Sequence, residues 1–166
     1  MVLPFRRMIT VEERKRVQSS FAQAERLADI VVLSFFQHLF SNAPELRTMF
    51  PNEIGAHGRK LFQMLKFIIE GLDEWPTLVP FLQSMGRRCA RVGLPDGAYA
   101  RLETALLQAL EGNLGPSLGA ADRIAWANLT GSIALTMTTA AATMRDGGYQ
   151  TTLLAKPSGS KPPLRP

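Results

Sequence analysis

The chain of 166 residues has 46% apolar and 20% charged residues and a net charge of +5, a composition typical of a globular protein long enough to bury one core. Most of the excess positive charge lies before residue 10 or after residue 145, and the stretch between carries 14 basic against 13 acidic side chains. This near-neutral stretch argues against nucleic-acid binding, and the single cysteine excludes an internal disulfide.

No secretory signal pattern is found at the start of the sequence. The most apolar runs, residues 30–36 and 133–144, are shorter than the roughly 18 residues that span a bilayer. The sequence therefore predicts a cytoplasmic protein without a transmembrane segment, either free or peripheral to a larger complex or membrane surface.

The first predicted helix begins near Val11, because Thr10 and Glu13 have the spacing of a capping box and apolar residues follow at helical intervals. Residues 30–40 are apolar nearly all round, which predicts a helix buried on several sides. The segment Asn42-Ala43-Pro44 then predicts the start of a short helix.

Two stripes of apolar residues at steps of three and four predict the next two helices. The first stripe spans residues 54–72 and turns His57 inward. The second spans residues 78–92, follows a Trp75-Pro76 start signal and turns Cys89 inward. One histidine and the only cysteine are thus expected inside the fold.

Gly93 and Pro95 break the chain before a helix over residues 99–110, and a final helix is predicted over 120–144. About seven helices and no alternating strand pattern predict an all-α fold. The expected organisation is a basic and apolar N-terminal extension over 1–9, a helical domain over 10–145 and a Gly/Pro-rich basic tail over 146–166.

Three stretches resemble the globin family, in particular neuroglobin and the single-domain bacterial globins. They are Phe36-Gln-His-Leu-Phe40 with Pro44 and Phe50, His57-Gly-Arg-Lys-Leu61, and residues 84–94. The resemblance continues in one register from about Thr10 to Arg145. It implies the three-on-three helical sandwich of a globin fold.

In this register His57 matches the distal histidine, and Cys89 replaces the proximal histidine. The resemblance implies a slot for heme b with Lys60 or Arg88 near a propionate, lined by Phe36, Phe50, Leu61, Met85, Leu94, Tyr99 and Ile133. Without the resemblance, the same apolar residues would be interpreted as ordinary core.

Three arrangements are open. Cys89 ligates ferric iron as a thiolate, with His57 opposite as sixth ligand or as donor to a bound gas. Against this, a cysteine sulfur lies closer to its backbone than an imidazole nitrogen, and an apolar site in mid-helix offers few donors to stabilise a thiolate.

In the second arrangement His57 alone holds the iron. In the third no haem binds, and both residues belong to the core, His57 bonded to a backbone carbonyl.

The preferred prediction is a haem-binding protein with Cys89 and/or His57 as axial ligands, acting in redox chemistry or gas sensing. A thiolate ligand opposite bound oxygen favours cleavage of the O–O bond over release of intact oxygen. This argues against simple oxygen carriage and allows at most weak peroxidase-like activity. A diatomic gas or a redox partner would then be bound. The alternative is a haem-free accessory subunit docked to a larger complex through residues 1–9 and 146–166.

Overall fold

The computed structural model describes residues 8–50 and 54–154, with side chains as far as residue 144. Within these residues the chain forms helices and no strand, which confirms the all-α class. In chain order they are α1 (Val11–Glu25), α2 (Ala28–Asn42), η1 (Pro44–Met49), α3 (Ile54–Glu70), η2 (Leu72–Glu74), α4 (Trp75–Arg91), α5 (Ala98–Leu114), η3 (Gly115–Ser117) and α6 (Ala120–Leu154), where η marks a 3₁₀ helix.

The helix start signals are confirmed by the local geometry. The Thr10 hydroxyl accepts a hydrogen bond from the backbone of Glu13 at 3.1 Å, and the Glu13 carboxylate accepts one from the backbone of Thr10 at 2.8 Å. Helix α4 begins at Trp75 with Pro76 in its first turn, where a missing N–H costs nothing.

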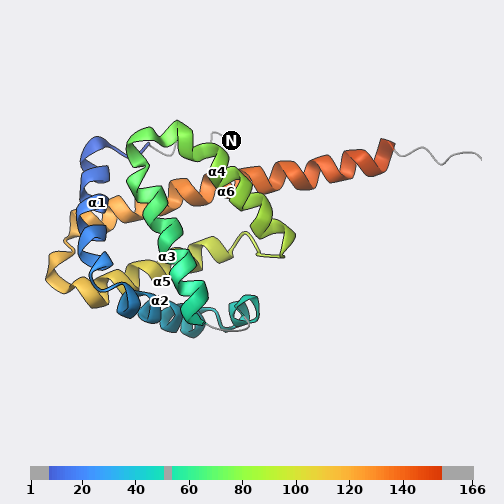
Figure 1. Ribbon diagram of the computed structural model, residues 1–166. Helices are drawn as coiled ribbons and strands as arrows, with labels where there is room; N and C mark the ends of the chain where they lie inside the picture. The colour runs from blue at the N-terminus through green and yellow to red at the C-terminus, as the bar shows by residue number, and fades with distance from the viewer. Residues whose placement is uncertain (1–7, 51–53, 155–166) are drawn as a thin grey trace, which may run out of the picture.

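The core lies where α2 packs along α5 and where α4 packs along α6, with α1 lying against α6 (Figure 1). Its largest fully buried side chains come from all six α-helices and η2: Val17, Phe36, Leu39, Ile68, Leu72, Leu82, Leu110, Trp126 and Leu129. A single continuous cluster of buried residues therefore holds the domain together.

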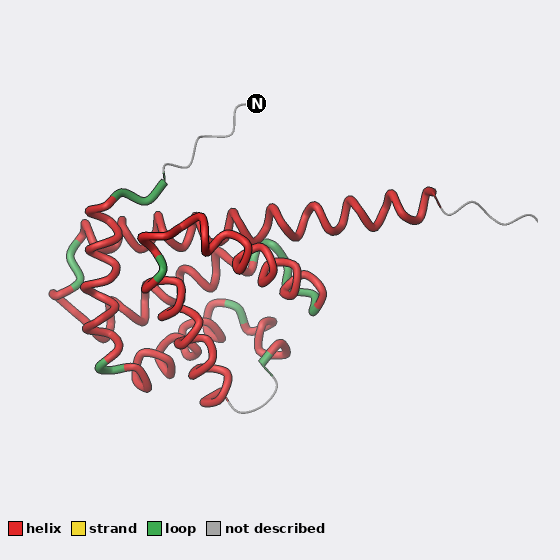
Figure 2. Tube along the Cα trace, turned by 45° about the horizontal axis from the view of Figure 1, so that its top comes forward, coloured by secondary structure: helices red, strands yellow, loops and turns green. Residues whose placement is uncertain are grey.

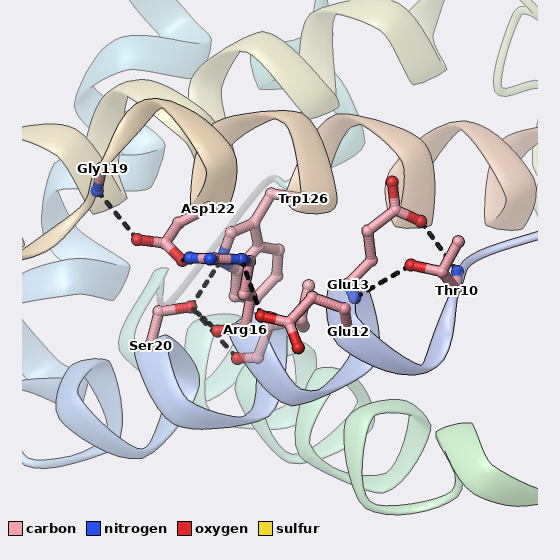
Figure 3. A network of polar contacts seen from close by, with 9 residues as sticks. Thr10, Glu12, Glu13, Arg16, Ser20, Gly119, Asp122 and Trp126 are labelled. Carbon is pink, nitrogen blue, oxygen red and sulfur yellow. Dashed lines mark hydrogen bonds and ion pairs between the residues drawn. The ribbon is translucent and has the colours of Figure 1, made fainter.

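A polar network joins α1 to α6 beside this core (Figure 3). The Trp126 indole N–H, in the second turn of α6, donates to the Ser20 hydroxyl at 2.8 Å, and that hydroxyl donates to the carbonyl of Arg16. Arg16 also pairs with Asp122 at 3.2 Å, and Asp122 accepts from the backbone of Gly119 ahead of α6. The buried indole is thereby satisfied, as burial of a polar group requires.

Helix α2 departs from its prediction. It buries Val31, Phe35, Phe36 and Leu39 but leaves Ile30 57% and Leu33 55% exposed. The expectation of burial on several sides is wrong for this outer face, because α5, α3 and η1 cover only the other sides. An apolar pattern on all sides of a helix therefore does not predict how many of those sides other helices cover.

Helix α6 continues past the expected end near Met144 and projects beyond the other helices as a rod (Figure 2). No proline occurs between Pro116 and Pro157, so Gly147 and Gly148 lower helix propensity without removing a hydrogen bond. Residues 1–7 and 155–166, on which the predicted docking of the termini largely rests, lie outside the described residues. None of the helices in the described part has the length and apolarity needed to cross a membrane.

Candidate functional site

Helices α3 and α4 diverge from η2 like the arms of an inverted V (Figure 1). Near η2 the rings of Phe67 and Phe81 meet edge to face, with their centroids 4.9 Å apart. Away from η2 the arms separate, and the two helices make hardly any further direct contact. We call residues 66–82 the closed end, and residues 54–65 of α3 with 83–91 of α4 the open end.

Burial differs sharply between the two ends. The closed end buries Ile68, Ile69, Leu72, Leu78 and Leu82, each at most 3% exposed. At the open end the only buried residues of the two helices are Gly58 and Gly86. The apolar side chains there are half-buried: Ile54, Leu61, Phe62, Met64, Leu65, Met85 and Cys89. Because an amphipathic helix normally buries its apolar stripe, the incomplete burial of these side chains makes the open end the candidate site.

On the α3 arm, His57 is half-buried and stands edge-on to Phe50, with ring centroids 6.0 Å apart. Phe50 packs in turn against Phe36, which is 1% exposed. A Cβ at Gly58 would lie 2.1 Å from a methyl of Val32, so glycine allows α3 to approach α2 closely and sets how α3 is turned. The His57 imidazole makes no hydrogen bond with the side chains and backbone that the structure describes.

On the α4 arm, Gly86 fixes the position of the helix on α6. A Cβ at this position would lie 2.2 Å from the carbonyl oxygen of Met137, so only glycine allows the two backbones to approach this closely. Cys89 follows one turn later. The direction in which Cys89 points is thus set by the contact of α4 with α6.

Cys89 lies in the last turn of α4, and the expectation of a mid-helix position is wrong. Gly93 adopts a φ of +85°, the Leu94 N–H donates to the Cys89 carbonyl at 3.0 Å, and the Gly93 N–H donates to Ala90 at 3.1 Å. These two bonds are the Schellman arrangement that ends a helix. They hold the backbone of Cys89 and bring Leu94 next to it.

The Tyr99 side chain of α5 lies beside the Cys89 side chain. Burial first, and then the neighbouring Cys89, raise the pKa of the Tyr99 hydroxyl above its ordinary value of 10.0. Tyr99 therefore keeps its proton at neutral pH and can donate to the sulfur. The sequence predicts Tyr99 in the haem slot and Cys89 as an iron ligand. It does not predict that the two lie side by side, because the turn between α4 and α5 brings them together.

The remaining predicted site residues come from several helices. Leu61, Met85, Leu94 and Ile133 are half-buried against the core, whereas Lys60 and Arg88 are exposed on the two arms. Phe36 lies deeper, inside a cluster of phenylalanines. Within the described residues no three His, Cys, Asp or Glu side chains gather as a metal site. The open end carries one histidine and one cysteine, His57 on α3 and Cys89 on α4.

Comparison with known proteins gives one family. A family model described as Globin matches residues 33–137. Neuroglobins from Dissostichus mawsoni and Chaenocephalus aceratus are each 31% identical to this chain over 108 residues, which cover 57% of this chain and 68% of theirs. Neuroglobin from Danio rerio is 27% identical over 117 residues, or 62% of this chain and 74% of its own.

Among solved structures, the chain is similar to an engineered carbene transferase made from a putative nitric oxide dioxygenase of Rhodothermus marinus. The TM-score is 0.75 at 20% sequence identity, over 85% of this chain and 99% of the other. This likeness shows a shared three-dimensional fold.

Proposed function

This chain belongs to the globin family, and from that premise we propose that it binds haem at the open end, where Cys89 and His57 would hold the iron, and acts in redox chemistry or gas sensing. Haem is the group that globins typically hold, and when bound it supplies an iron that binds diatomic gases and exchanges electrons.

The observation that carries the proposal is the open end itself. Two apolar stripes are left half-buried there, and the arms carry His57 and Cys89, whose side chains can ligate iron. A flat macrocycle between the arms would cover both stripes, and Lys60 and Arg88 are exposed where propionates could meet positive charge. The residues present therefore fit haem.

The surroundings of His57 support a ligand role over a purely structural one. A buried imidazole that serves only packing is expected to bond a backbone carbonyl or another polar group. His57 has no such bond among the described residues, although it is half-buried against Phe50. The lack of a hydrogen-bond partner among the described residues supports a role for its imidazole as an iron ligand.

The contact with Tyr99 supports Cys89 as a ligand. The carbonyl end of a helix disfavours a nearby negative charge, so a thiolate in the last turn of α4 needs a compensating donor. The Tyr99 hydroxyl lies against the sulfur and keeps its proton. A thiolate ligand donates electron density to iron, which suits redox or sensing chemistry better than reversible oxygen carriage.

The test is an absorption spectrum of the purified protein before and after a stoichiometric titration with hemin. Cys89→Ala and His57→Ala are measured beside the parent protein, and Cys89→His serves as the positive control because it restores the ligand usual at this position of the family. We expect one hemin per chain, a Soret band that moves in both alanine variants, and a spectrum of bis-histidine type for Cys89→His.

Two outcomes would contradict the proposal in different ways. A Soret band that Cys89→Ala leaves unchanged and His57→Ala moves would assign the iron to His57 alone. A parent protein that takes up no hemin, while Cys89→His does, would show that the cysteine has removed haem binding from this globin.

A further inference from the structure

A pocket of about 160 Å³ lies between the first turns of α1 and α4 and the middle of α6. Helices α1 and α4 both pack on α6, which brings these three segments together. Trp75, the first residue of α4, lines the pocket, whereas Cys89 lies in the last turn of the same helix. The pocket is therefore separated from the open end by about 20 Å along α4. We call it the Arg14 pocket, after the charged residue in its wall.

Much of the wall of the Arg14 pocket is apolar. Ile9 and Trp75 are half-buried there, whereas Met8 is 71% and Leu135 50% exposed, so the pocket is open to solvent. In another protein an apolar cavity of about 150 Å³ holds benzene. The Arg14 pocket therefore has room for a molecule built on a single ring.

Arg14 gives the pocket a cationic wall with loosely held donors. Its Nε is buried 3.5 Å from a carboxylate oxygen of Asp73 without forming a hydrogen bond, and its Nη1 donates to the Leu72 carbonyl at 3.5 Å. Both contacts are at the long limit for such groups. The other terminal nitrogen, Nη2, has no partner among the described residues and is not buried. The guanidinium can thus still donate to a ligand.

The polar residues on the opposite wall cannot replace Arg14 in this role. Ser132 and Thr136 of α6 line the pocket, and their hydroxyls donate to the carbonyls of Asn128 and Ser132 at 2.8 and 2.9 Å. Because each hydroxyl proton is already used, these oxygens can only accept a hydrogen bond from a ligand. An acid group in the pocket is therefore expected at Arg14.

The geometry points to a binding site for a small organic acid with a flat apolar body. Its carboxylate pairs with the Arg14 guanidinium, and its body lies against Trp75, Ile9 and Leu135. The present partner of Arg14 offers little competition, because the Asp73 side chain is 69% exposed and an ion pair of that kind contributes little. This inference does not depend on haem.

The experiment uses the full, isotope-labelled chain without hemin and follows the indole N–H signals by NMR as sodium benzoate is added. Trp75 and Trp126 are the two tryptophans of the chain, and Trp75→Phe assigns their signals. Trp126 is fully buried and bonded to Ser20, so its signal serves as the internal control. Benzamide, a neutral molecule of nearly the same shape, and acetate, which lacks the ring, are titrated in the same way.

The charge variant is Arg14→Gln. Its matched control is Lys15→Gln, which removes the same charge from the next residue of α1, an exposed side chain without an ion pair among the described residues. The position of the Trp126 signal shows whether each variant keeps the contact of α1 with α6. If Arg14→Gln does not fold, the comparison of benzoate with benzamide in the parent protein decides the question.

We expect benzoate to move the Trp75 signal and to leave the Trp126 signal in place. Benzamide and acetate should each bind about tenfold more weakly than benzoate, because one lacks the charge and the other the apolar body. Arg14→Gln should weaken benzoate binding about tenfold and Lys15→Gln less than about twofold.

Three results would overturn the inference. They are equal affinities for benzoate and benzamide, a benzoate titration that leaves the Trp75 signal unmoved, and equal losses of affinity in Arg14→Gln and Lys15→Gln. A failure of hemin uptake affects none of these readouts, because the titrations contain no hemin.

Discussion

The closed and open ends of the α3–α4 pair are built from the same kind of sequence but differ in what covers them. Each helix carries one apolar stripe along its length, and the closed end buries it in the core beside α1 and α6. At the open end the arms separate and the same stripe is only half-buried. The closed end therefore contributes most to stability, and the open end leaves part of its apolar surface exposed.

The difference has an energetic consequence. Fully burying a leucine side chain contributes about 1.5–3 kcal/mol, and each half-buried residue of the open end gains only part of this. A group that binds between the arms would gain the remainder and would stabilise the folded state through its binding. The same substitution should therefore change the stability of the protein by different amounts at the closed end and at the open end.

The largest expected effect compares Leu82→Ala at the closed end with Leu61→Ala at the open end. Leu82 is 0% exposed and Leu61 is half-buried. We expect Leu82→Ala to lower the free energy of unfolding by about 3 kcal/mol and Leu61→Ala by about 1 kcal/mol, as measured by urea denaturation of the haem-free protein. Equal costs would show that the open end closes in solution. With hemin added, Leu61→Ala should weaken hemin binding and Leu82→Ala should not.

A smaller effect is expected where α4 is seated on α6. Gly86→Ala should cost about 2 kcal/mol, because the new methyl meets the backbone of Met137 and one helix must move. Gly112→Ala is the control: Gly112 lies inside α5 with nothing within 4 Å of an added Cβ, so this change should stabilise by about 0.5 kcal/mol. Thermal unfolding of both variants measures the difference. If Gly86→Ala were neutral, α4 would not be fixed by this contact.

The smallest effect concerns Tyr99 at the open end. The pKa of the Tyr99 hydroxyl is raised in the folded protein above the value of 10.0 that it has in the unfolded chain. The protonated hydroxyl therefore contributes its full stabilisation of the folded state below about pH 10, and this contribution is lost as pH rises above about 10. We expect the free energy of unfolding of the haem-free protein to fall above about pH 10, by less than the ~1.4 kcal/mol per pH unit that one fully shifted proton gives, because Tyr99 is only half-buried.

Urea titrations across this pH range measure the slope. Tyr99→Phe should flatten it, and Tyr149→Phe, which removes the other tyrosine, is the control. A slope that Tyr149→Phe flattens and Tyr99→Phe leaves unchanged would contradict the assignment.

The sequence by itself determined the helical class, the starts of α1 and α4 and the inward direction of His57 and Cys89. These depend on local rules: the Thr10 capping box, the position of Pro76 and the spacing of apolar residues act within one or two turns. The same local patterns also placed the two candidate ligands on successive helices.

Only the tertiary structure decided what covers each helix. The exposure of Ile30 and Leu33 and the proximity of Tyr99 to Cys89 depend on neighbours far away in sequence or across a turn. The pattern along a helix records which face is apolar, whereas the packing of other helices fixes whether that face is buried. The open end results from this difference, since its stripe looks like core in the sequence and is only partly covered by the fold.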